Sequence, residues 1–169
     1  SENAYQRMRL SQDLAEMHRL DSVLAENSRL QSLILDNATV GIAFVRNRVQ
    51  EWANPRLAEI FQYTQNEFKA IPTRQLYVNE AAYLEVGQKC YAALGRGERY
   101  VNELQMRRKD GSHVWLRMEG TAINPAEPQG GSIWIWEDIT ERKAAELSLI
   151  KLNAELEERI KKRTAELQT

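Results

Sequence analysis

The spacing of apolar residues changes twice along this 169-residue chain, and no other feature constrains the fold as strongly. Residues 5–35 contain neither proline nor glycine, and their apolar side chains recur at helical intervals, as do those of residues 141–167. Within residues 100–139 the period falls to two, which is typical of strands. The pattern predicts an N-terminal helix over 1–35, a mixed α/β domain over 36–140 and a C-terminal helix over 141–169.

Both terminal helices carry an apolar stripe interrupted by polar residues. In the first, a seven-residue step typical of coiled coils relates several of the apolar positions, and Asn27 would be a polar residue that fixes the register. A helix that lies along its own domain is the alternative. We expect the helices to form a dimer through Leu10, Met17, Leu20, Leu24, Leu149, Leu152, Leu156 and Ile160.

The middle segment has the residues expected of five strands. Short apolar runs at 40–45 and 49–53 flank a polar turn and read as a hairpin. Asp110-Gly111 separates two alternating segments as a tight antiparallel turn, and a loop rich in proline and glycine precedes a last strand over 132–139. The order, with two strands, several short helices and three more strands, predicts an α+β fold in which helices cover one face of an antiparallel sheet.

Capping residues mark where the helices begin. Asn54, followed by Pro55, predicts an N-cap and first turn, and Thr64 predicts a capping box with a glutamate three residues later. Asn79 is expected to cap a helix that runs to about residue 94. Thr140 is the predicted N-cap of the C-terminal helix.

Composition narrows the class of protein. The formal net charge of −1 and the pI near 6.2 give no field that would attract nucleic acid. No apolar run approaches the ~20 residues of a membrane span, so we expect no membrane contact within this segment. The single cysteine, Cys90, excludes an internal disulfide and any multi-cysteine metal site, and it suits the cytoplasm. The chain starts at Ser1 without a methionine and stops inside a helical pattern, so we expect it to be part of a longer protein.

Four segments together resemble the PAS domain with its C-terminal PAC segment. They are Asn54-Pro55, the residues 61–68 (FQYTQNEF), the residues 108–112 (RKDGS) with Trp115, and the residues 138–143 (DITERK). The helix that follows, residues 152–167, is similar to linkers that join PAS domains to histidine kinases or diguanylate cyclases. The chain departs from the family at Gln62 and Ala70, where glycine is common.

The resemblance implies a cleft between the inner face of the sheet and the short helices. By alternation and by similarity to family members with chromophores, we expect the cleft to be lined by Leu104, Met106, Val114, Leu116, Met118, Trp134 and Trp136, with Cys90 from the preceding helix. Cys90 is expected to be a small buried hydrophobe. Two tryptophans can fill a small cleft or stack on a planar ligand.

The sequence lacks the residues by which members of the family attach flavin covalently or ligate haem through histidine. The cysteine of the flavin photosensors is missing from residues 69–78, and the two histidines, His18 and His113, are expected outside the cleft. A cysteinyl-flavin adduct and His-ligated haem are therefore not expected, whereas a noncovalent flavin or a metabolite stays open. We predict no catalytic residue and no metal site, because neither a nucleophile–base pair nor a phosphate-binding loop is present.

The expected function is signalling by a homodimer. A PAS module would pass a change in the cleft through Asp138 and Thr140, where the last strand becomes the output helix, to a downstream effector. The first interpretation of that effector is a histidine kinase; the alternatives are a diguanylate cyclase or phosphodiesterase, a noncovalent small-molecule receptor, and a dimerisation adaptor without input. The apolar outer face of the sheet is expected to be covered by the N-terminal helix.

Overall fold

The computed structural model describes residues 1–69 and 71–168, so Ala70, one of the two departures from the family pattern, lies outside the described residues. The chain divides into two compact units, residues 1–38 and residues 39–169. Within the described residues, no helix has the length and apolar character that a membrane span requires.

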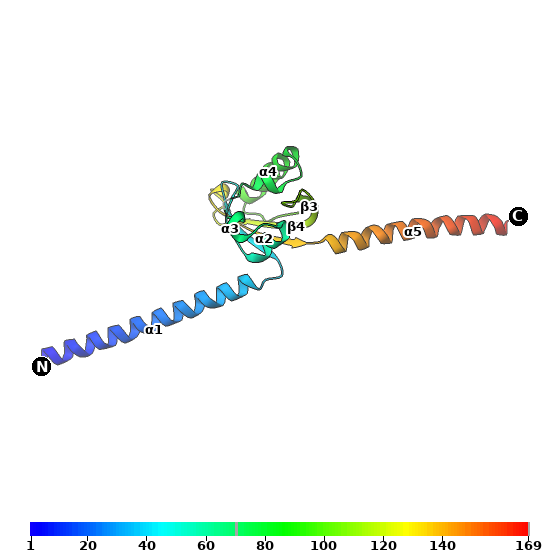
Figure 1. Ribbon diagram of the computed structural model, residues 1–169. Helices are drawn as coiled ribbons and strands as arrows, with labels where there is room; N and C mark the ends of the chain where they lie inside the picture. The colour runs from blue at the N-terminus through cyan, green and yellow to red at the C-terminus, as the bar shows by residue number, and fades with distance from the viewer. Residues whose placement is uncertain (70, 169) are drawn as a thin grey trace. The chain divides into compact units, whose positions relative to one another are not determined.

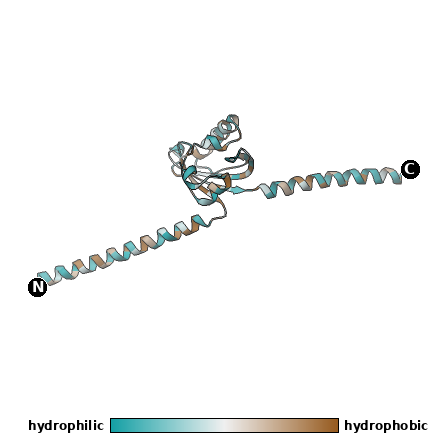
Figure 2. Cartoon of the chain, in the orientation of Figure 1, coloured by the Kyte–Doolittle hydropathy of each residue, from teal (hydrophilic) through white to brown (hydrophobic). Residues whose placement is uncertain are grey.

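The first unit is a single helix, α1, over Glu2–Asp36. It ends at Asn37, whose backbone N–H and side-chain amide both donate to the carbonyl of Leu33 at 3.2 and 2.8 Å. No residue of α1 is buried, and Figure 2 shows hydrophobic and hydrophilic residues interspersed along it. The predicted N-terminal helix is confirmed, and its apolar side chains are exposed: Leu10, Leu14, Met17, Leu20, Leu24, Leu30 and Ile34.

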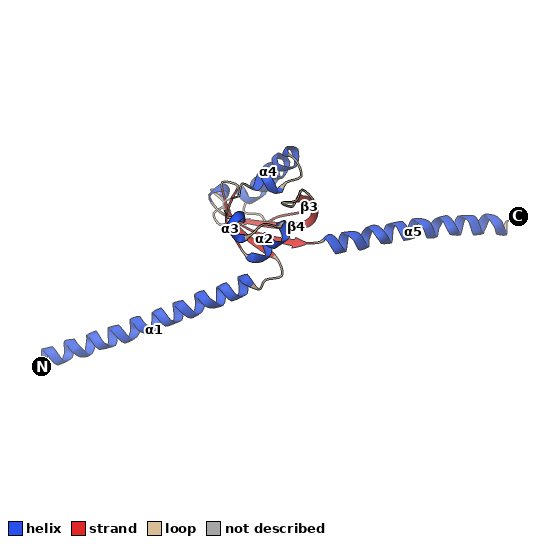
Figure 3. Ribbon diagram, viewed as in Figure 1, coloured by secondary structure: helices blue, strands red, loops and turns tan. Residues whose placement is uncertain are grey.

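The second unit is built on a five-stranded sheet. The strands are β1 (Gly41–Arg46), β2 (Val49–Ala53), β3 (Tyr100–Arg107), β4 (His113–Ala122) and β5 (Ser132–Asp138). Their order across the sheet is β2-β1-β5-β4-β3, and every neighbouring pair is antiparallel. The last strand of the chain therefore lies at the centre of the sheet. Figure 3 shows the strands in red and the helices in blue.

Helices pack on one face of this sheet. They are α2 (Pro55–Phe61), α3 (Gln65–Phe68), α4 (Glu80–Gly95) and two short 3-10 helices, η1 (Thr73–Leu76) and η2 (Pro128–Gly130); α5 (Thr140–Leu167) follows the sheet (Figure 1). The predicted caps are present: the side chain of Asn54 accepts from Leu57, that of Asn79 accepts from Ala82, and Thr64 forms a capping box. The predicted sheet with helices on one face is thus confirmed.

Strand alternation separates the core from the outer face. Along β5, Trp134 and Trp136 are 4% and 2% exposed, whereas Ile133 and Ile135 are 47% and 40% exposed. The inner face and the helices enclose one core cluster, to which α2 contributes Leu57 and Phe61. The two tryptophans therefore face inward, as alternation and the family resemblance together predict.

Gln62 ends α2 in the left-handed conformation, with φ 66° and ψ 29°. This conformation costs an L-residue roughly 1–2 kcal/mol and is the reason why glycine is common at such positions. With its amide oriented to donate, the side-chain nitrogen of Gln62 lies 3.0 and 3.1 Å from the carboxylate oxygens of Asp110. The loop therefore keeps the left-handed turn without glycine, and the contact with Asp110 offsets part of the cost.

The prediction that Thr140 caps α5 is wrong. Ile139 occupies the N-cap position, and Thr140 is the first residue of the helix. Because Thr140 is already helical, its side chain is not in the N-cap position, and its hydroxyl donates to the carboxylate of Asp138 at 2.6 Å instead. The same carboxylate oxygen accepts from the backbone N–H of Thr140 at 3.0 Å, so Asp138 supplies the acceptor at the start of the helix.

Candidate functional site

The side chains predicted to line a cleft lie in two environments. Met106, Val114, Leu116 and Met118 are all at most 2% exposed and form the floor of the core. Leu104 is only half-buried, because β3 is an edge strand, and it lines a surface groove beside α4 instead. Strand alternation thus places the first four in the interior, but it does not show which of them border free space.

The interior holds a cavity of about 20 Å³. A cavity of this size has room for about one water molecule. Four of the predicted residues line it, and five others do so that the sequence did not single out. The complete lining is Val45, Arg48, Thr73, Tyr77, Cys90, Tyr91, Met118, Trp134 and Trp136.

The two tryptophans fill most of the space between sheet and helices. The ring of Trp136 meets that of Phe61 edge to face, with centroids 5.4 Å apart and an angle of 75° between the planes. Trp134 meets Tyr100 in the same manner at 6.3 Å, and its indole N–H donates to the hydroxyl of Ser132 at 2.8 Å. Gly120, the partner of Trp134 on β4, leaves room for the indole because it has no Cβ. A Cβ at this position would lie 2.4 Å from the ring. The cleft is therefore largely occupied by the protein's own side chains.

Arg48 is the main residue of the site that sequence reasoning missed. It lies in the turn between β1 and β2, where Asn47 and Arg48 both have positive φ, at 50° and 59°. Its guanidinium lies 3.5 Å from the centre of the Tyr83 ring on α4 and donates to the Tyr83 carbonyl at 3.1 Å. A turn arginine normally extends into solvent, so the only sequence signal is Gly87, where a Cβ would lie 2.3 Å from the guanidinium.

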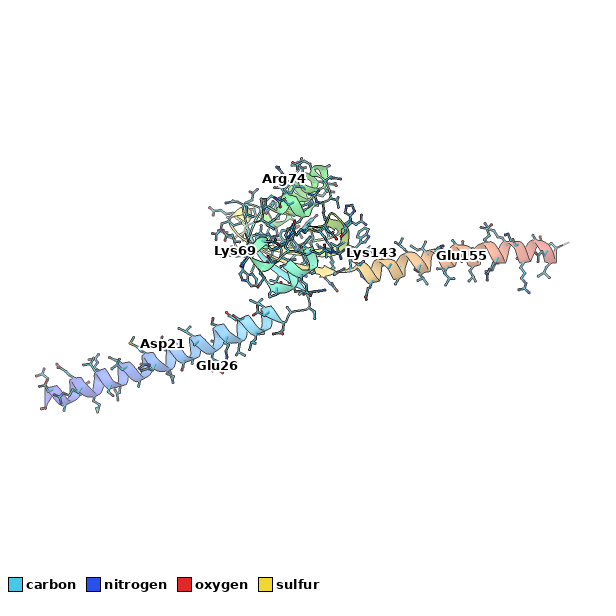
Figure 4. All side chains as sticks on the ribbon, in the orientation of Figure 1. Asp21, Glu26, Lys69, Arg74, Lys143 and Glu155 are labelled. Atoms are coloured by element: carbon cyan, nitrogen blue, oxygen red, sulfur yellow. The ribbon has the colours of Figure 1, made fainter. Side chains whose placement is uncertain are left out.

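Two more tyrosines complete the surroundings of Arg48. The rings of Tyr77 and Tyr91 each lie 5.9 Å from the guanidinium carbon, within the range of cation–π attraction. Arg74, labelled in Figure 4, lies 4.9 Å from the ring of Tyr83 and pairs with Glu80 at 3.1 Å. Two arginines therefore flank one tyrosine, and Arg74 has a carboxylate partner.

Buried polar atoms without a partner are concentrated on this side of the core. Among the described residues they are the indole N–H of Trp136, the hydroxyl of Thr73 and both amide atoms of Gln50. Each such atom costs about 1–3 kcal/mol when it stays unpaired. Thr73 and Trp136 both line the cavity, so a hydrogen-bonding occupant would satisfy them.

Burial keeps the titratable groups of the cavity neutral. Burial raises the pKa of the Cys90 thiol to about 11, although the charge of Arg48 opposes this shift. Burial likewise raises the pKa of Tyr91 to about 12 and the pKa of Tyr77 further still. Cys90 is therefore a thiol rather than a thiolate at neutral pH, in keeping with a buried hydrophobe.

A second group of residues joins the sheet to α5. Besides the bonds between Asp138 and Thr140, the N–H of Ile139 donates to the carbonyl of Trp115 at 3.0 Å, so the residue that links β5 to α5 is held to β4. Lys143, labelled in Figure 4, lies 5.0 Å from the centre of the Trp115 ring. The start of α5 is thus attached to the outer side of the sheet.

Glu103 on β3 pairs with two basic residues in the first turn of α5. Its carboxylate accepts from the guanidinium of Arg142 and lies 3.0 Å from the ammonium of Lys143. The hydrogen bond from Arg142, followed by that from Lys143, lowers the pKa of Glu103. These exposed pairs orient the helix more than they stabilise the fold.

Within the described residues, no group of three or more histidine, cysteine, aspartate or glutamate side chains gathers as metal ligands do. The site consists of a small, mainly apolar cavity with a few unpartnered polar atoms and, on the same strand β5, the joint to α5. Trp134 and Trp136 are separated from Asp138 by four and two positions.

Comparisons with known proteins agree with this architecture. A family model described as PAS domain matches residues 37–141. Sensor protein TdiS from Thauera aromatica is 31% identical over 128 residues, which cover 76% of the chain. The chain spans only 23% of the length of that relative.

Solved structures share the fold at low sequence identity. The PAS domain of a transcriptional regulator in the LuxR family from Burkholderia thailandensis, in complex with ethanol, has a TM-score of 0.60 and 23% identity, covering 63% of this chain and 95% of that one. A sensory box histidine kinase/response regulator from the same organism has a TM-score of 0.60 and 22% identity, covering 77% and 98%.

Proposed function

The chain belongs to the PAS domain family, and from this premise we propose that it dimerises and relays a signal through α5 to a downstream effector. The PAS domain is a noncatalytic sensory module related to those of sensor histidine kinases, and the effector we propose is a histidine kinase. The observation that carries the proposal is the continuity of β5 with α5: the strand that lines the cavity becomes the output helix after one residue.

The proposed route of the signal has three physical steps. An occupant of the cavity changes the position of Trp134 or Trp136 on β5. Because β5 ends at Asp138, its movement alters the two hydrogen bonds to Thr140 and the ion pairs of Glu103 with Arg142. The orientation of α5 then shifts between two arrangements of similar energy.

The volume of the cavity bears on which ligand the module could hold. The cavity of about 20 Å³ is far below the roughly 300–1,000 Å³ of usual ligand pockets, so a flavin would need a large rearrangement of the core. The proposal therefore favours a very small occupant over a flavin.

A diguanylate cyclase or phosphodiesterase is the alternative effector. We also propose that the module lies in the cytoplasm.

The joint is tested by fusing residues 1–169 to a histidine kinase and replacing Asp138 with alanine. Loss of the acceptor at the start of α5 is expected to change basal autophosphorylation by about fivefold or more, within the usual range of coupling energies. Glu141→Ala, in the same turn, leaves the Asp138 bonds in place and is the control. Autophosphorylation that Asp138→Ala leaves unchanged would remove this joint from the mechanism.

Dimerisation is tested by sedimentation of the chain, whose single subunit has a mass of 19.6 kDa. Leu20 and Leu156 are 52% and 53% exposed, and apolar stripes of this length require a partner surface. We expect the wild-type chain to sediment with twice the subunit mass. Leu20→Glu is expected to weaken the dimer at least about tenfold, because it would bury an unpaired charge in the interface. Arg19→Glu, beside the stripe, should retain the dimer, whereas a wild-type chain that sediments as one subunit would contradict the proposal.

A further inference from the structure

The cavity next to Arg48 is lined mainly by apolar and aromatic side chains, among which a few groups donate hydrogen bonds. Among the described residues that line it, none is aspartate or glutamate. Arg48 contributes a positive charge, Trp136 an indole N–H that can only donate, and Thr73 a hydroxyl; the last two are unpartnered, with residue exposures of 2% and 7%. Such a lining favours an occupant that accepts hydrogen bonds and carries negative charge.

No other group in the lining supplies that negative charge. Burial holds Cys90 and Tyr91 in their neutral forms at pH 7. The nearby arginine, Arg74, is already paired with Glu80. Arg48 is compensated by tyrosine rings, by the Tyr83 carbonyl and by a side-chain hydrogen bond with Tyr77, all of which are weaker partners than a carboxylate.

The position of Arg48 is maintained at a conformational cost. Its φ of 59° is left-handed, which an L-residue other than asparagine or aspartate rarely adopts. Its carbonyl accepts from the N–H of Thr73 at 2.9 Å, so the turn is tied to η1 beside the cavity. Strain of this kind at one residue is often associated with a binding site.

Arg48 and Tyr91 also separate the cavity from a surface depression. Both residues line a second hollow of about 570 Å³ together with Leu84, Gly87, Gln88 and Gln129. This depression likewise has no acidic residue in its described lining. A movement of the Arg48 side chain alone would therefore join the two spaces and open a route from solvent.

From these observations we propose that the cavity binds the carboxylate group of a small monocarboxylic acid. The carboxylate would accept from the Arg48 guanidinium, the Trp136 indole and the Thr73 hydroxyl, while the remainder of the acid lies toward the depression. One guanidinium matches one carboxylate, and because the cavity has room for only about one water molecule, binding of a carboxylate requires the Arg48 side chain to move and join the two spaces. The inference deepens the sensory function proposed above and rests on it, because Trp136 lies on the strand that continues into α5.

Acetate is the probe, with acetamide as its neutral counterpart of nearly the same shape. The ¹H–¹⁵N spectrum of the chain contains one indole signal for each of its four tryptophans. At constant ionic strength set by sodium chloride, acetate is expected to shift the Trp136 signal, assigned with Trp136→Phe, to a saturating value. Acetamide is expected to leave it in place, and an equal shift by both compounds would overturn the proposal.

Two variants test the role of Arg48. Arg48→Met removes the guanidinium and is expected to weaken acetate binding about tenfold or more, as loss of a charged hydrogen-bond partner does. Gly87→Ala keeps the arginine but displaces it, since the new Cβ would lie 2.3 Å from Nη1, and it is expected to weaken binding in the same direction. Arg46→Met, in the same hairpin but exposed, is the control and should bind acetate as the wild type does.

An unchanged acetate affinity in Arg48→Met or Gly87→Ala would refute the site. Far-UV circular dichroism shows whether each variant is folded. If a variant is not folded, the acetate and acetamide titrations of the wild-type chain still test the site. Dimerisation and the effect of Asp138→Ala are measured without acetate. Failure of the relay is therefore distinguished from failure of the acetate site.

Discussion

Replacing Trp136 with alanine is expected to lower the free energy of unfolding by about 3–5 kcal/mol. Trp136 is 2% exposed and packs edge to face on Phe61, so truncation would leave a large cavity beside one that already exists. Phe61 on α2 packs against this ring and Met118 on β4 is the pairing partner of Trp136, and a packed site of this kind is expected to close only in part. Urea denaturation followed by far-UV circular dichroism measures the change.

The matched control for Trp136 is its neighbour on the outer face of the same strand. Ile135→Ala removes apolar surface from a residue that is 40% exposed, and we expect a loss below about 1.5 kcal/mol. Trp136→Phe keeps an aromatic ring and removes an N–H that has no partner, so it should cost less than the alanine variant. Equal losses in Trp136→Ala and Ile135→Ala would show that the inner face of β5 is not the core.

Replacing Asn54 with alanine is expected to cost about 2–4 kcal/mol, more than the loss of an ordinary helix cap. The Asn54 side chain is fully buried, and its hydrogen bonds include three with backbone groups. Its Oδ1 accepts from the N–H groups of Ile42 at 2.8 Å and Leu57 at 3.2 Å, and its Nδ2 donates to the carbonyl of Val40 at 3.0 Å. Alanine would leave these backbone groups without their partners at a site closed to water.

Asn79 provides the comparison, since it has the same residue type and the same capping role in an exposed position. Its side chain accepts from the N–H of Ala82 at 2.8 Å. Asn79→Ala is expected to cost about 1 kcal/mol, because water can bind the released N–H. Urea denaturation of both variants measures the difference, and a loss in Asn54→Ala no greater than that in Asn79→Ala would contradict the role of burial.

The fold could be predicted from the sequence where local patterns and tertiary packing agree. Alternation along the last strand put Trp134 and Trp136 on one face, and Asn54-Pro55 marked the start of α2. Both signals act over a few residues and need no information about the rest of the chain. That this face points inward came from the resemblance to a family, and the order of the strands across the sheet does not follow from such local signals.

Arg48 could not be found in this way, because the features that place it are distant in sequence. Its partners Tyr77, Tyr83 and Tyr91 come from segments that the fold brings to the β1–β2 turn, and Gly87 leaves the room it needs. Sequence alone treats an arginine in a turn as solvated. The prediction that Thr140 is the N-cap was wrong for a local reason, since the helix begins at Thr140 itself and Ile139 occupies the N-cap position.

Leu104 shows a third limit of sequence patterns. Alternation correctly showed which residues of β3 share the inner face. It does not reveal that β3 is the edge strand of the sheet. Leu104 is consequently half-buried, whereas Met106 on the same face is fully buried. Which residues of a face border a cavity depends on where the helices end above it.

The central position of β5 has a consequence for synthesis of the protein. Until residues 132–138 have left the ribosome, the chain can form only the β1–β2 and β3–β4 hairpins, which have no contact with each other in the finished sheet. Two-stranded hairpins are marginally stable in water, so the nascent domain stays open until its last strand inserts between them. Assembly of the sheet and release of the helix that follows it are therefore nearly simultaneous events.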